Sequence, residues 1–160
     1  MTWRSSTTPV DRIFASLVYL IPLYNGIVYG RFLFDQFPVL NYIKYPLIPL
    51  AIIYGLIPFG LGSLLVFIAL FVGVVRNEKI PHFIRFNTMQ AILISILLSL
   101  IGLIYSFILE PIIRGFITEV LFNTIFLGVI AAVGYSIFQS AQGRYAEIPV
   151  ISEASYLQTR

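Results

Sequence analysis

The sequence predicts an all-α integral membrane protein, a single-domain four-helix bundle with short interfacial segments. Three observations predict this fold class. Hydrophobic residues make up 59% of the 160 residues and charged residues only 11%, against about 25% in an ordinary soluble domain. The mean hydropathy is +0.93. Four stretches without Asp, Glu, Lys or Arg each hold at least 18 residues, close to the ~20 that a transmembrane helix needs.

The first apolar stretch carries signals for its start and for an interruption. Thr8, Pro9 and Asp11 supply an N-cap hydroxyl, a proline at the first helical position and an acid at the third. Pro22 and Gly26 lie in the middle of the stretch, so we expect a kink there. The predicted spans are residues 12–30, 56–75, 86–109 and 120–142.

Two segments lie outside the predicted spans. Residues 31–50 hold three prolines and scattered aromatic residues, which is typical of the membrane interface, and part of the segment is expected to form a short in-plane helix. Residues 143–160 form a polar tail.

The third helix is predicted to be longer than the membrane is thick. Pro81 suits its first turn, and a helix from there to Leu109 would be about 44 Å long. The hydrocarbon core is ~30 Å thick, so the first two turns are expected in the headgroup layer. Glu110 and Pro111 are predicted to end this helix, and Gly143 to end the fourth.

The basic residues predict the orientation. Seven of the ten Lys and Arg residues lie in the N-terminal segment, the 76–85 loop and the tail, and three lie in the alternate segments. Because basic residues gather on the cytoplasmic side, both termini are expected there, or in the stroma of a plastid. The net charge of +3 is small, and no nucleic acid partner is expected.

The segment "RNEKIPHFIRFNTMQ" (76–90) combines dense charge with the only histidine. One interpretation is a topology signal that also binds anionic lipid headgroups. Another is a docking platform, because polar groups surround the helix instead of following one face. Its occupant could be a partner or the chain's own "ISEASYLQ" tail. The candidate partner-docking residues are Arg76, Lys79, His82, Arg85, Asn87 and Gln90.

Small residues follow one face of the third and of the fourth predicted span. Such stripes are typical of close helix packing in membranes, and the alternative is a weakly polar groove along which a polypeptide slides. Asn25 and Asn123 are the deeper polar residues, expected to bond each other or partner helices. The candidate helix-packing residues are Ser95, Ser99, Gly102, Ser106, Thr124, Gly128 and Ala132.

The residues offer little for catalysis. The chain has no Cys and one His, so Glu78 and His82 would supply only two ligands where a catalytic zinc site usually has three. The glycine-rich "GLIPFGLGSLL" lacks the Lys-Ser/Thr ending of a phosphate loop. We expect no enzyme activity and no catalytic residues, metal or cofactor.

An aqueous channel through a single copy is also disfavoured. Pore walls need carbonyls, charges or hydroxyls, and residues 86–109 and 120–143 contain no ionisable side chain. Four such helices would pack together without a wet lumen. The sequence therefore favours a membrane-embedded subunit of a larger assembly.

Three blocks of the sequence carry a resemblance that covers nearly the whole chain in order. They are "DRIFASLVYLIPLYNGIVYGRFLFDQFPVL" (11–40), "LLVFIALFVGVVRNEKIPHFIRFNTMQAILI" (64–94) and "IPVISEASYLQ" (148–158). Together they resemble the twenty-kilodalton subunit family of the translocon at the chloroplast inner envelope, including its cyanobacterial members. The resemblance implies four membrane helices, stromal or cytoplasmic termini, and a role in protein import. No transit peptide is visible, which favours a cyanobacterial or plastid-encoded member.

The resulting functional expectation is a subunit of a protein translocation complex that helps form or scaffold a polypeptide-conducting path. The alternatives are an assembly or structural factor of another membrane complex, and a small-solute or ion channel. The expected partners are other membrane subunits, a second copy of the chain, the translocating polypeptide and lipid. The expected location is a cyanobacterial inner or thylakoid membrane, or the plastid inner envelope.

Overall fold

The computed structural model describes residues 7–159, and helices make up 82% of these residues. The described residues contain no strand. Four helical stretches are long and apolar enough to cross a membrane, which confirms the predicted all-α membrane fold. Arg4 and Arg160, two of the basic residues behind the predicted orientation, lie outside the described residues. The four stretches are Pro9–Gln36, Pro38–Leu56, His82–Leu109 and Phe116–Ala141.

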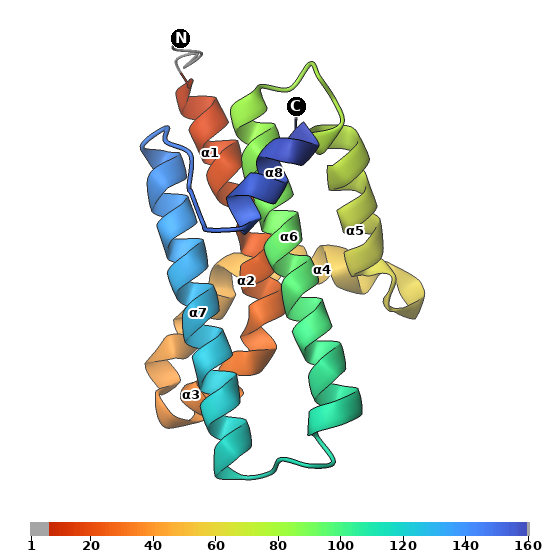
Figure 1. The fold of residues 1–160 in the computed structure, drawn as a ribbon, viewed down its shortest axis with the longest axis vertical. Coiled ribbons are helices and arrows are strands. Elements are labelled where there is room, and N and C mark those ends of the chain that lie inside the picture. The colour runs from red at the N-terminus through yellow and green to blue at the C-terminus, as the bar shows by residue number, and fades with distance from the viewer. Residues whose placement is uncertain (1–6, 160) are drawn as a thin grey trace.

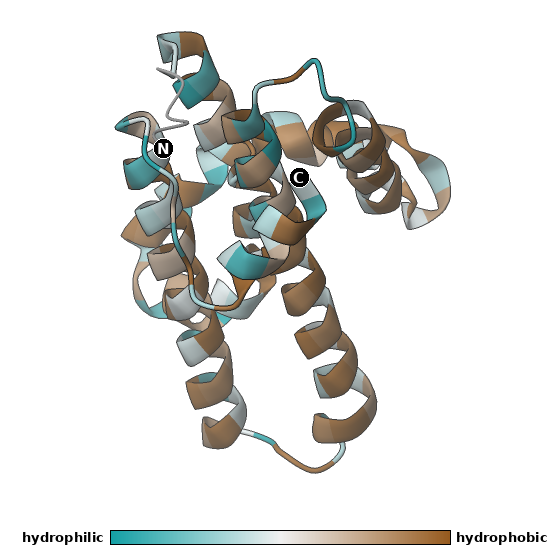
Figure 2. Cartoon of the chain, turned by 45° about the horizontal axis from the view of Figure 1, so that its top comes forward, coloured by the Kyte–Doolittle hydropathy of each residue, from teal (hydrophilic) through white to brown (hydrophobic). Residues whose placement is uncertain are grey.

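The long helices of the bundle run side by side along the long axis of the molecule (Figure 1). A short C-terminal helix packs on the outside of one of them, and both chain ends lie toward one end of the bundle, named here the tail end. Figure 2 shows hydrophilic residues gathered toward this end. The first of these long elements is built from two short helices, α1 (Pro9–Leu17) and α2 (Leu20–Gly26). The others are α6 (His82–Ile104) and α7 (Phe116–Ala141), and the C-terminal helix is α8 (Ile151–Thr159).

The first span starts where the sequence predicts. Thr8 Oγ1 accepts a hydrogen bond from the Asp11 N–H (3.2 Å), and the Asp11 carboxylate accepts one from the Thr8 N–H (2.9 Å), which together form a capping box. The helix is irregular on both sides of Pro22. It breaks between α1 and α2, and it tightens into a 3₁₀ helix over Ile27–Gly30.

The predicted second span, residues 56–75, is not one continuous helix in the structure. α4 (Ile48–Leu56) ends where that span was expected to begin, and α5 (Gly62–Leu70) follows a turn and continues as a π-helical turn to Val75. Pro58 has no N–H, and Phe59 and Gly60 adopt φ values of +62° and +69°, so no helix passes through this turn.

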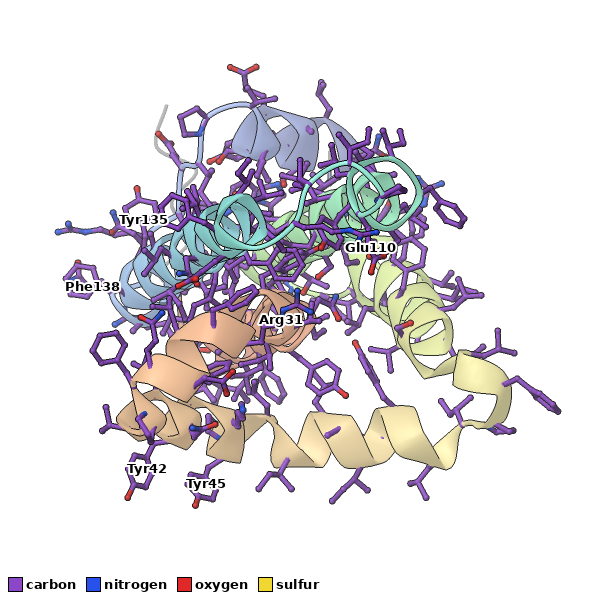
Figure 3. All side chains as sticks on the ribbon, turned by 90° about the horizontal axis from the view of Figure 1, so that it is seen from below. Arg31, Tyr42, Tyr45, Glu110, Tyr135 and Phe138 are labelled. Carbon is purple, nitrogen blue, oxygen red and sulfur yellow. The ribbon has the colours of Figure 1, made fainter. Side chains whose placement is uncertain are left out.

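A different apolar stretch has the length of a second span. It combines a 3₁₀ helix over Pro38–Leu47 with α4. Figure 3, which looks along the bundle from below, shows α4 lying across the bundle and not along it. The sequence predicts an in-plane helix within residues 31–50, whereas α3 (Arg31–Gln36) and the 3₁₀ helix occupy most of that segment. Which segment completes the second crossing stays a prediction.

The third and fourth helices end close to the predicted positions. α6 begins one residue after Pro81, whose ψ of 137° is not helical, and the helix continues as a π-helical turn to Leu109. α7 ends at Ala141. Gly143 follows with φ +72°, and a Cβ there would overlap the Thr7 hydroxyl, so both the backbone and the space favour glycine.

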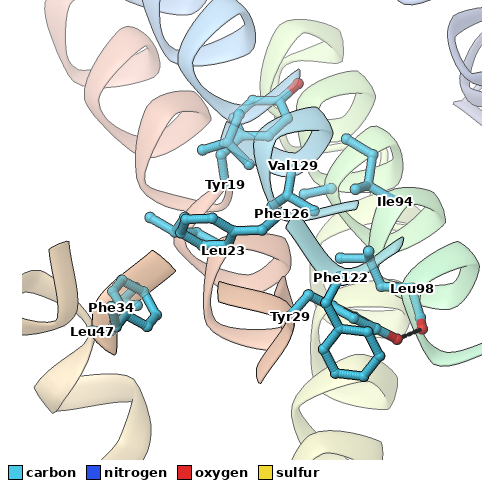
Figure 4. Packing of buried hydrophobic residues seen from close by; sticks show 12 residues of the cluster. Tyr19, Leu23, Tyr29, Phe34, Leu47, Ile94, Leu98, Phe122, Phe126 and Val129 are labelled. Carbon is cyan, nitrogen blue, oxygen red and sulfur yellow. Dashed lines mark hydrogen bonds between the residues drawn. The ribbon is translucent and has the colours of Figure 1, made fainter. Parts of the chain in front are cut away.

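The main core lies between the first span, α6 and α7 (Figure 4). Aromatic edge-to-face pairs join these elements, with ring centroids 5.3 Å apart for Tyr29 and Phe122 and 5.2 Å apart for Phe34 and Phe126. The Tyr29 hydroxyl donates to the Leu98 carbonyl (2.8 Å). The buried cluster contains Tyr19, Leu23, Tyr29, Phe34, Leu47, Ala91, Ile94, Leu98, Phe122, Phe126, Val129 and Val133.

Glycine allows the first span to approach α7 closely. A Cβ added at Gly26 would lie 2.7 Å from Val129 Cγ1, and one added at Gly30 would lie 2.9 Å from a Phe126 ring carbon. These distances are too short for real side chains, so the backbone of the first span lies directly against α7.

Replacing Gly26 by Ala is expected to lower the free energy of unfolding by about 1–3 kcal/mol, because the added methyl group overfills a packed contact. Gly128→Ala is the matched control, since nothing lies within 4 Å of that position and alanine favours a helix by up to about 1 kcal/mol over glycine. Thermal unfolding in detergent micelles, followed by circular dichroism, compares the two variants. Equal shifts would show that the first span does not approach α7 this closely.

Candidate functional site

A cluster of buried polar side chains joins four parts of the chain near the tail end. We name it the polar junction. Its central residues, Asn87 and Gln90, come from α6 and are fully buried. A buried amide is costly unless its polar atoms are hydrogen-bonded. The junction consists of Tyr19, Asn87, Gln90, Ser140 and Ser152.

Asn87 connects the first span, α6 and α7. Its Oδ1 accepts from the Tyr19 hydroxyl (2.8 Å) and from the Ser140 hydroxyl (2.9 Å), while its Nδ2 donates to the Phe83 carbonyl (2.8 Å). The same Tyr19 oxygen accepts from Gln90 Nε2 (3.0 Å). The two amides therefore share one tyrosine hydroxyl, which both donates and accepts.

Gln90 also connects α6 to the tail. The Ser152 hydroxyl, in the first turn of α8, lies 3.0 Å from Gln90 Oε1 and donates to it. The same Ser152 oxygen accepts from the Ile148 N–H (2.6 Å), at the point where the tail turns into α8. Ser152 thus holds both the helix and the segment leading to it against α6.

His82 makes a second connection between α6 and the tail. Burial, with help from the neighbouring Tyr156 phenol, raises the pKa of the Tyr145 phenol above its ordinary value. Tyr145 therefore keeps its proton, and its hydroxyl oxygen lies 3.0 Å from His82 Nδ1. The Thr159 hydroxyl donates to the Ser155 carbonyl (2.8 Å), so His82 Nε2 must be the donor to Thr159 Oγ1 (3.2 Å).

Aromatic contacts surround these hydrogen bonds. The Phe86 ring centroid lies 4.5 Å from that of Tyr156 and 5.0 Å from that of Tyr145, and the His82 ring stacks on Tyr156 at 6.3 Å. Ring pairs at such distances stabilise packing beyond the area that they bury. The tail is therefore an integral part of the bundle surface.

The candidate docking residues divide into two groups. Asn87 and Gln90 are enclosed by the chain itself, and Arg85 is only 9% exposed, with its Nε donating to the Val75 carbonyl (2.8 Å). These three are not available to a separate partner, because amides and a guanidinium in an apolar bundle bond within it. His82 contacts the tail. The sequence analysis gave the tail and a separate partner as the two possible occupants of this platform. Arg76 and Lys79 are exposed.

Two candidate packing residues of the third span, Ser95 and Ser99, line an open cavity. We name this cavity, which has a volume of ≈ 330 Å³, the lateral groove, and residues of α2, α4, α5 and α6 line it. The Ser95 and Ser99 hydroxyls donate to their own helix at the Ala91 and Ser95 carbonyls (2.9 and 3.0 Å). The lining residues are Ile21, Asn25, Tyr54, Ser63, Leu64, Val66, Phe67, Leu70, Ile92, Ser95, Ile96, Ser99 and Leu100.

The other candidate packing residues differ in their surroundings. A Cβ at Gly102 would lie 3.0 Å from the Tyr29 hydroxyl, so this residue lies against the first span. Ser106, Thr124 and Gly128 are exposed, and Ala132 is half-buried. Most of the α7 stripe therefore does not pack against another helix of this chain.

Asn25 and Asn123 do not pair with each other among the described residues. Asn25 lines the lateral groove, while Asn123 Oδ1 is buried without a hydrogen-bond partner from residues 7–159. Their separate surroundings rule out the predicted mutual bond as a link between the first and fourth spans.

Charged residues meet at the end of the bundle opposite the tail end. Arg31 lies over the Phe122 ring, 4.5 Å from its centroid, and Glu119 accepts from Gln36 Nε2 (2.6 Å). Glu110 and Arg114 line an open cavity with them, and Figure 3 shows Arg31 and Glu110 on this face. Stacking of Arg31 on aromatic rings and the bond between Gln36 and Glu119 account for these contacts.

Tyr19, Ser140 and Ser152 are the functional residues that sequence reasoning missed. Tyr19 lies 68 residues from Asn87 in the chain, so no local pattern connects them. The only signal is the presence of two amides, Asn87 and Gln90, in an apolar helix. Such amides need buried partners.

The described residues contain no group of three or more His, Asp or Glu that could hold a metal ion. Their polar groups instead join helices or line the open lateral groove. The fold and the site therefore define a helical multi-pass membrane protein with an internally bonded polar junction and a laterally open groove.

Comparison with known proteins identifies the family. The family model described as chloroplast import apparatus Tic20-like matches residues 7–155. A Tic20 family protein of Synechocystis sp. is 50% identical over 161 residues, covering 100% of this chain and 99% of that protein. The chain belongs to the Tic20 family, which confirms the resemblance read from the sequence.

More distant relatives are named for plastids. Protein TIC 20-II, chloroplastic, of Arabidopsis thaliana is 36% identical over 114 residues, which cover 69% of this chain and 53% of that protein. Tic20 family protein Ycf60 of Gracilaria tenuistipitata var. liui is 35% identical over 156 residues, covering 94% of this chain and 76% of that protein. The family is named for an import apparatus and is not a known enzyme family.

Replacing Ser152 by Ala is expected to destabilise the docked tail by about 1–3 kcal/mol, because Gln90 Oε1 and the Ile148 N–H both lose their partner. Ser155→Ala is the matched control in the same helix, since the Ser155 hydroxyl donates only to the Ile151 carbonyl four residues before it. Hydrogen exchange of the α8 amides in detergent measures the difference. Unchanged exchange in Ser152→Ala would contradict the role of the junction in holding the tail.

Proposed function

We propose that the chain is a membrane-embedded subunit of a protein translocation complex, and that the lateral groove forms one wall of a polypeptide-conducting path. Membership of a family named for the chloroplast import apparatus supports the first part. The groove is the single structural observation that carries the second part. It combines a mostly apolar lining with the Asn25 amide and with serine hydroxyls.

A path beside the bundle suits the packing better than a path through it. The interior between the first span, α6 and α7 is filled by aromatic and aliphatic side chains such as Tyr29, Phe122 and Phe126. A filled core leaves no continuous lumen for an extended polypeptide. Other membrane subunits would therefore have to complete the path around the groove.

The groove lining has the chemistry that a passing polypeptide needs. An unpaired peptide group in hydrocarbon costs several kcal/mol, and the Asn25 amide and the Ser63 and Ser95 hydroxyls offer hydrogen bonds that lower this cost. Apolar neighbours such as Ile92 and Leu100 contact side chains without selecting one sequence. Weak, mixed contacts of this kind favour movement over tight binding.

The proposed orientation places both termini on the cytoplasmic or stromal side, in a cyanobacterial membrane or the plastid inner envelope. The described ends of the chain lie toward one end of the bundle (Figure 1). The exposed Arg76 and Lys79, in the loop before α6, belong to the basic side of the sequence. A surplus of basic residues marks the side that is not translocated.

Site-specific photocrosslinking in native membranes tests the path. A photoreactive residue at Ser95 is expected to crosslink to a polypeptide arrested during translocation, because Ser95 lines the groove. Leu103 is the control, since it lies on the same helix and is exposed outside the groove. Equal crosslinking at both positions, or none at Ser95 with an arrested chain present, would overturn the path.

Single-cysteine labelling tests the orientation, and the chain has no natural cysteine to interfere. Leu157→Cys in α8 and Tyr42→Cys in the 3₁₀ segment are both at exposed positions. A membrane-impermeant maleimide is expected to label them from opposite sides, with Leu157→Cys on the cytoplasmic or stromal side. Labelling of both from one side would mean that the proposed topology is wrong.

A further inference from the structure

Another open cavity lies where the first span meets the interfacial segment. Its volume is ≈ 330 Å³, and residues from the end of the first span, from α3 and from the following 3₁₀ helix line it. Arg31 and Lys44 line this cavity together with one acid, Asp35. We name it the basic cavity. It shares no lining residue with the lateral groove, and its role is therefore separate from the proposed path.

Aromatic rings hold both cations of the basic cavity in place. The Arg31 guanidinium lies 4.7 Å from the Phe32 ring centroid and 4.5 Å from that of Phe122. The Lys44 ammonium lies 4.1 Å from the ring centroid of Phe34. Cations at such distances are attracted to the ring faces. Phe34 and Phe122 belong to the buried core, so the two charged groups are fixed to the bundle while Arg31 and Lys44 stay exposed.

Neither cation has an acidic partner in the part of the chain that the structure describes. There, no carboxylate oxygen lies within 4.0 Å of the Arg31 guanidinium or of the Lys44 ammonium. Lys44 Nζ donates instead to the neutral Asn41 Oδ1 (2.7 Å). Glu119 lines a neighbouring cavity with Arg31, but it accepts from Gln36 Nε2 (2.6 Å). The fold therefore positions two cations close to one cavity without pairing either of them.

The surroundings of the basic cavity are typical of the headgroup level of a membrane. Tyr42 and Tyr45, from the 3₁₀ helix, are 68% and 62% exposed, and Figure 3 shows both pointing away from the bundle. Exposed tyrosines gather at the membrane interface. In the proposed orientation this end lies on the translocated side, where Lys and Arg are disfavoured. Setting the topology therefore does not account for Arg31 and Lys44.

We propose that the basic cavity binds the headgroup of an anionic lipid whose headgroup also carries hydroxyl groups. The acid group lies between Arg31 and Lys44, because a guanidinium offers paired N–H donors and an ammonium adds a compact positive charge. Asp35 repels a headgroup that is an acid alone, but its carboxylate accepts hydrogen bonds from headgroup hydroxyls. The three charged side chains thus select both the charge and the hydroxyl groups of the lipid.

The apolar side of the cavity favours a lipid over a free anion. Ile27 and Val28 line this side, and Val28 is 59% exposed. The acyl chains of a lipid cover this wall while its acid group meets the cations, so one molecule matches both sides of the cavity. A soluble phosphate matches only the charged side.

Thermal unfolding of the purified chain in uncharged detergent micelles tests this site. Added phosphatidylglycerol is expected to raise the unfolding temperature more than added phosphatidylcholine does. Arg31→Gln and Lys44→Gln are each expected to weaken the apparent affinity for phosphatidylglycerol about fivefold, the effect of one basic residue at an anionic membrane surface. Each variant is compared with itself without lipid, so that lost packing is separated from lost binding.

Arg114→Gln is the matched control. It removes the same charge at the same end of the bundle but outside the basic cavity, so it is expected to leave the affinity unchanged. Phosphatidic acid, which lacks headgroup hydroxyls, is expected to bind more weakly than phosphatidylglycerol, and Asp35→Asn is expected to narrow this difference. If Lys44→Gln does not fold, Arg31→Gln decides, together with Lys44→Arg, which keeps the charge and is expected to keep the binding.

Each other outcome overturns the proposal. Full affinity in Arg31→Gln and Lys44→Gln, or an equal loss in Arg114→Gln, would mean that the cavity does not bind the lipid. Equal stabilisation by phosphatidylcholine would mean that the headgroup is not selected, and equal binding of phosphatidic acid would mean that its hydroxyls are not. Equal stabilisation by soluble glycerol phosphate would mean that the cavity takes a free anion. None of these results depends on whether Ser95 crosslinks to an arrested polypeptide.

Discussion

The arrangement of the helices depends on the buried amide of Asn87. Its hydrogen bonds to Tyr19, Ser140 and the Phe83 carbonyl join the first span, α6 and α7 at one point. Hydrophobic contacts alone fix helix positions weakly in a membrane, because lipid is as apolar as the side chains. A buried amide has a definite set of partners, so it selects one rotation and one depth for each helix. Gln90 extends the same network to the tail.

Polar groups that are hydrogen-bonded within the chain lie in a different place from polar groups that line the open groove. Near the tail end, the amides and His82 bond within the chain, and the tail covers them. Between α5 and α6, serine side chains line an open groove. In hydrocarbon, open polar groups mark the side where other molecules complete a membrane protein.

Local chemistry made much of the fold predictable from the sequence. The capping box of Thr8 and Asp11, the end of the third helix at Glu110 and the glycine after α7 each depend on neighbouring residues. The turn between α4 and α5 was not predicted because the apolar stretch without charged residues continues across it. Pro58 and Gly60 are the residues that could have indicated this turn. The junction was missed because Tyr19 meets Asn87 only after the chain has folded. The groove depends on the tilt of α5, which no local pattern encodes.

The placement of the tail follows from the same physics as the placement of the helices. Asn87 and Gln90 enter the bundle on a helix whose first turns are predicted to extend beyond the hydrocarbon, so one side of that helix would otherwise face headgroups and water. α8 covers this side with Ser152 and with aromatic rings that match Phe86. Water competing for Gln90 would weaken the junction and, through Tyr19, the contact between the first span and α6. The tail therefore protects the hydrogen bonds that set the bundle.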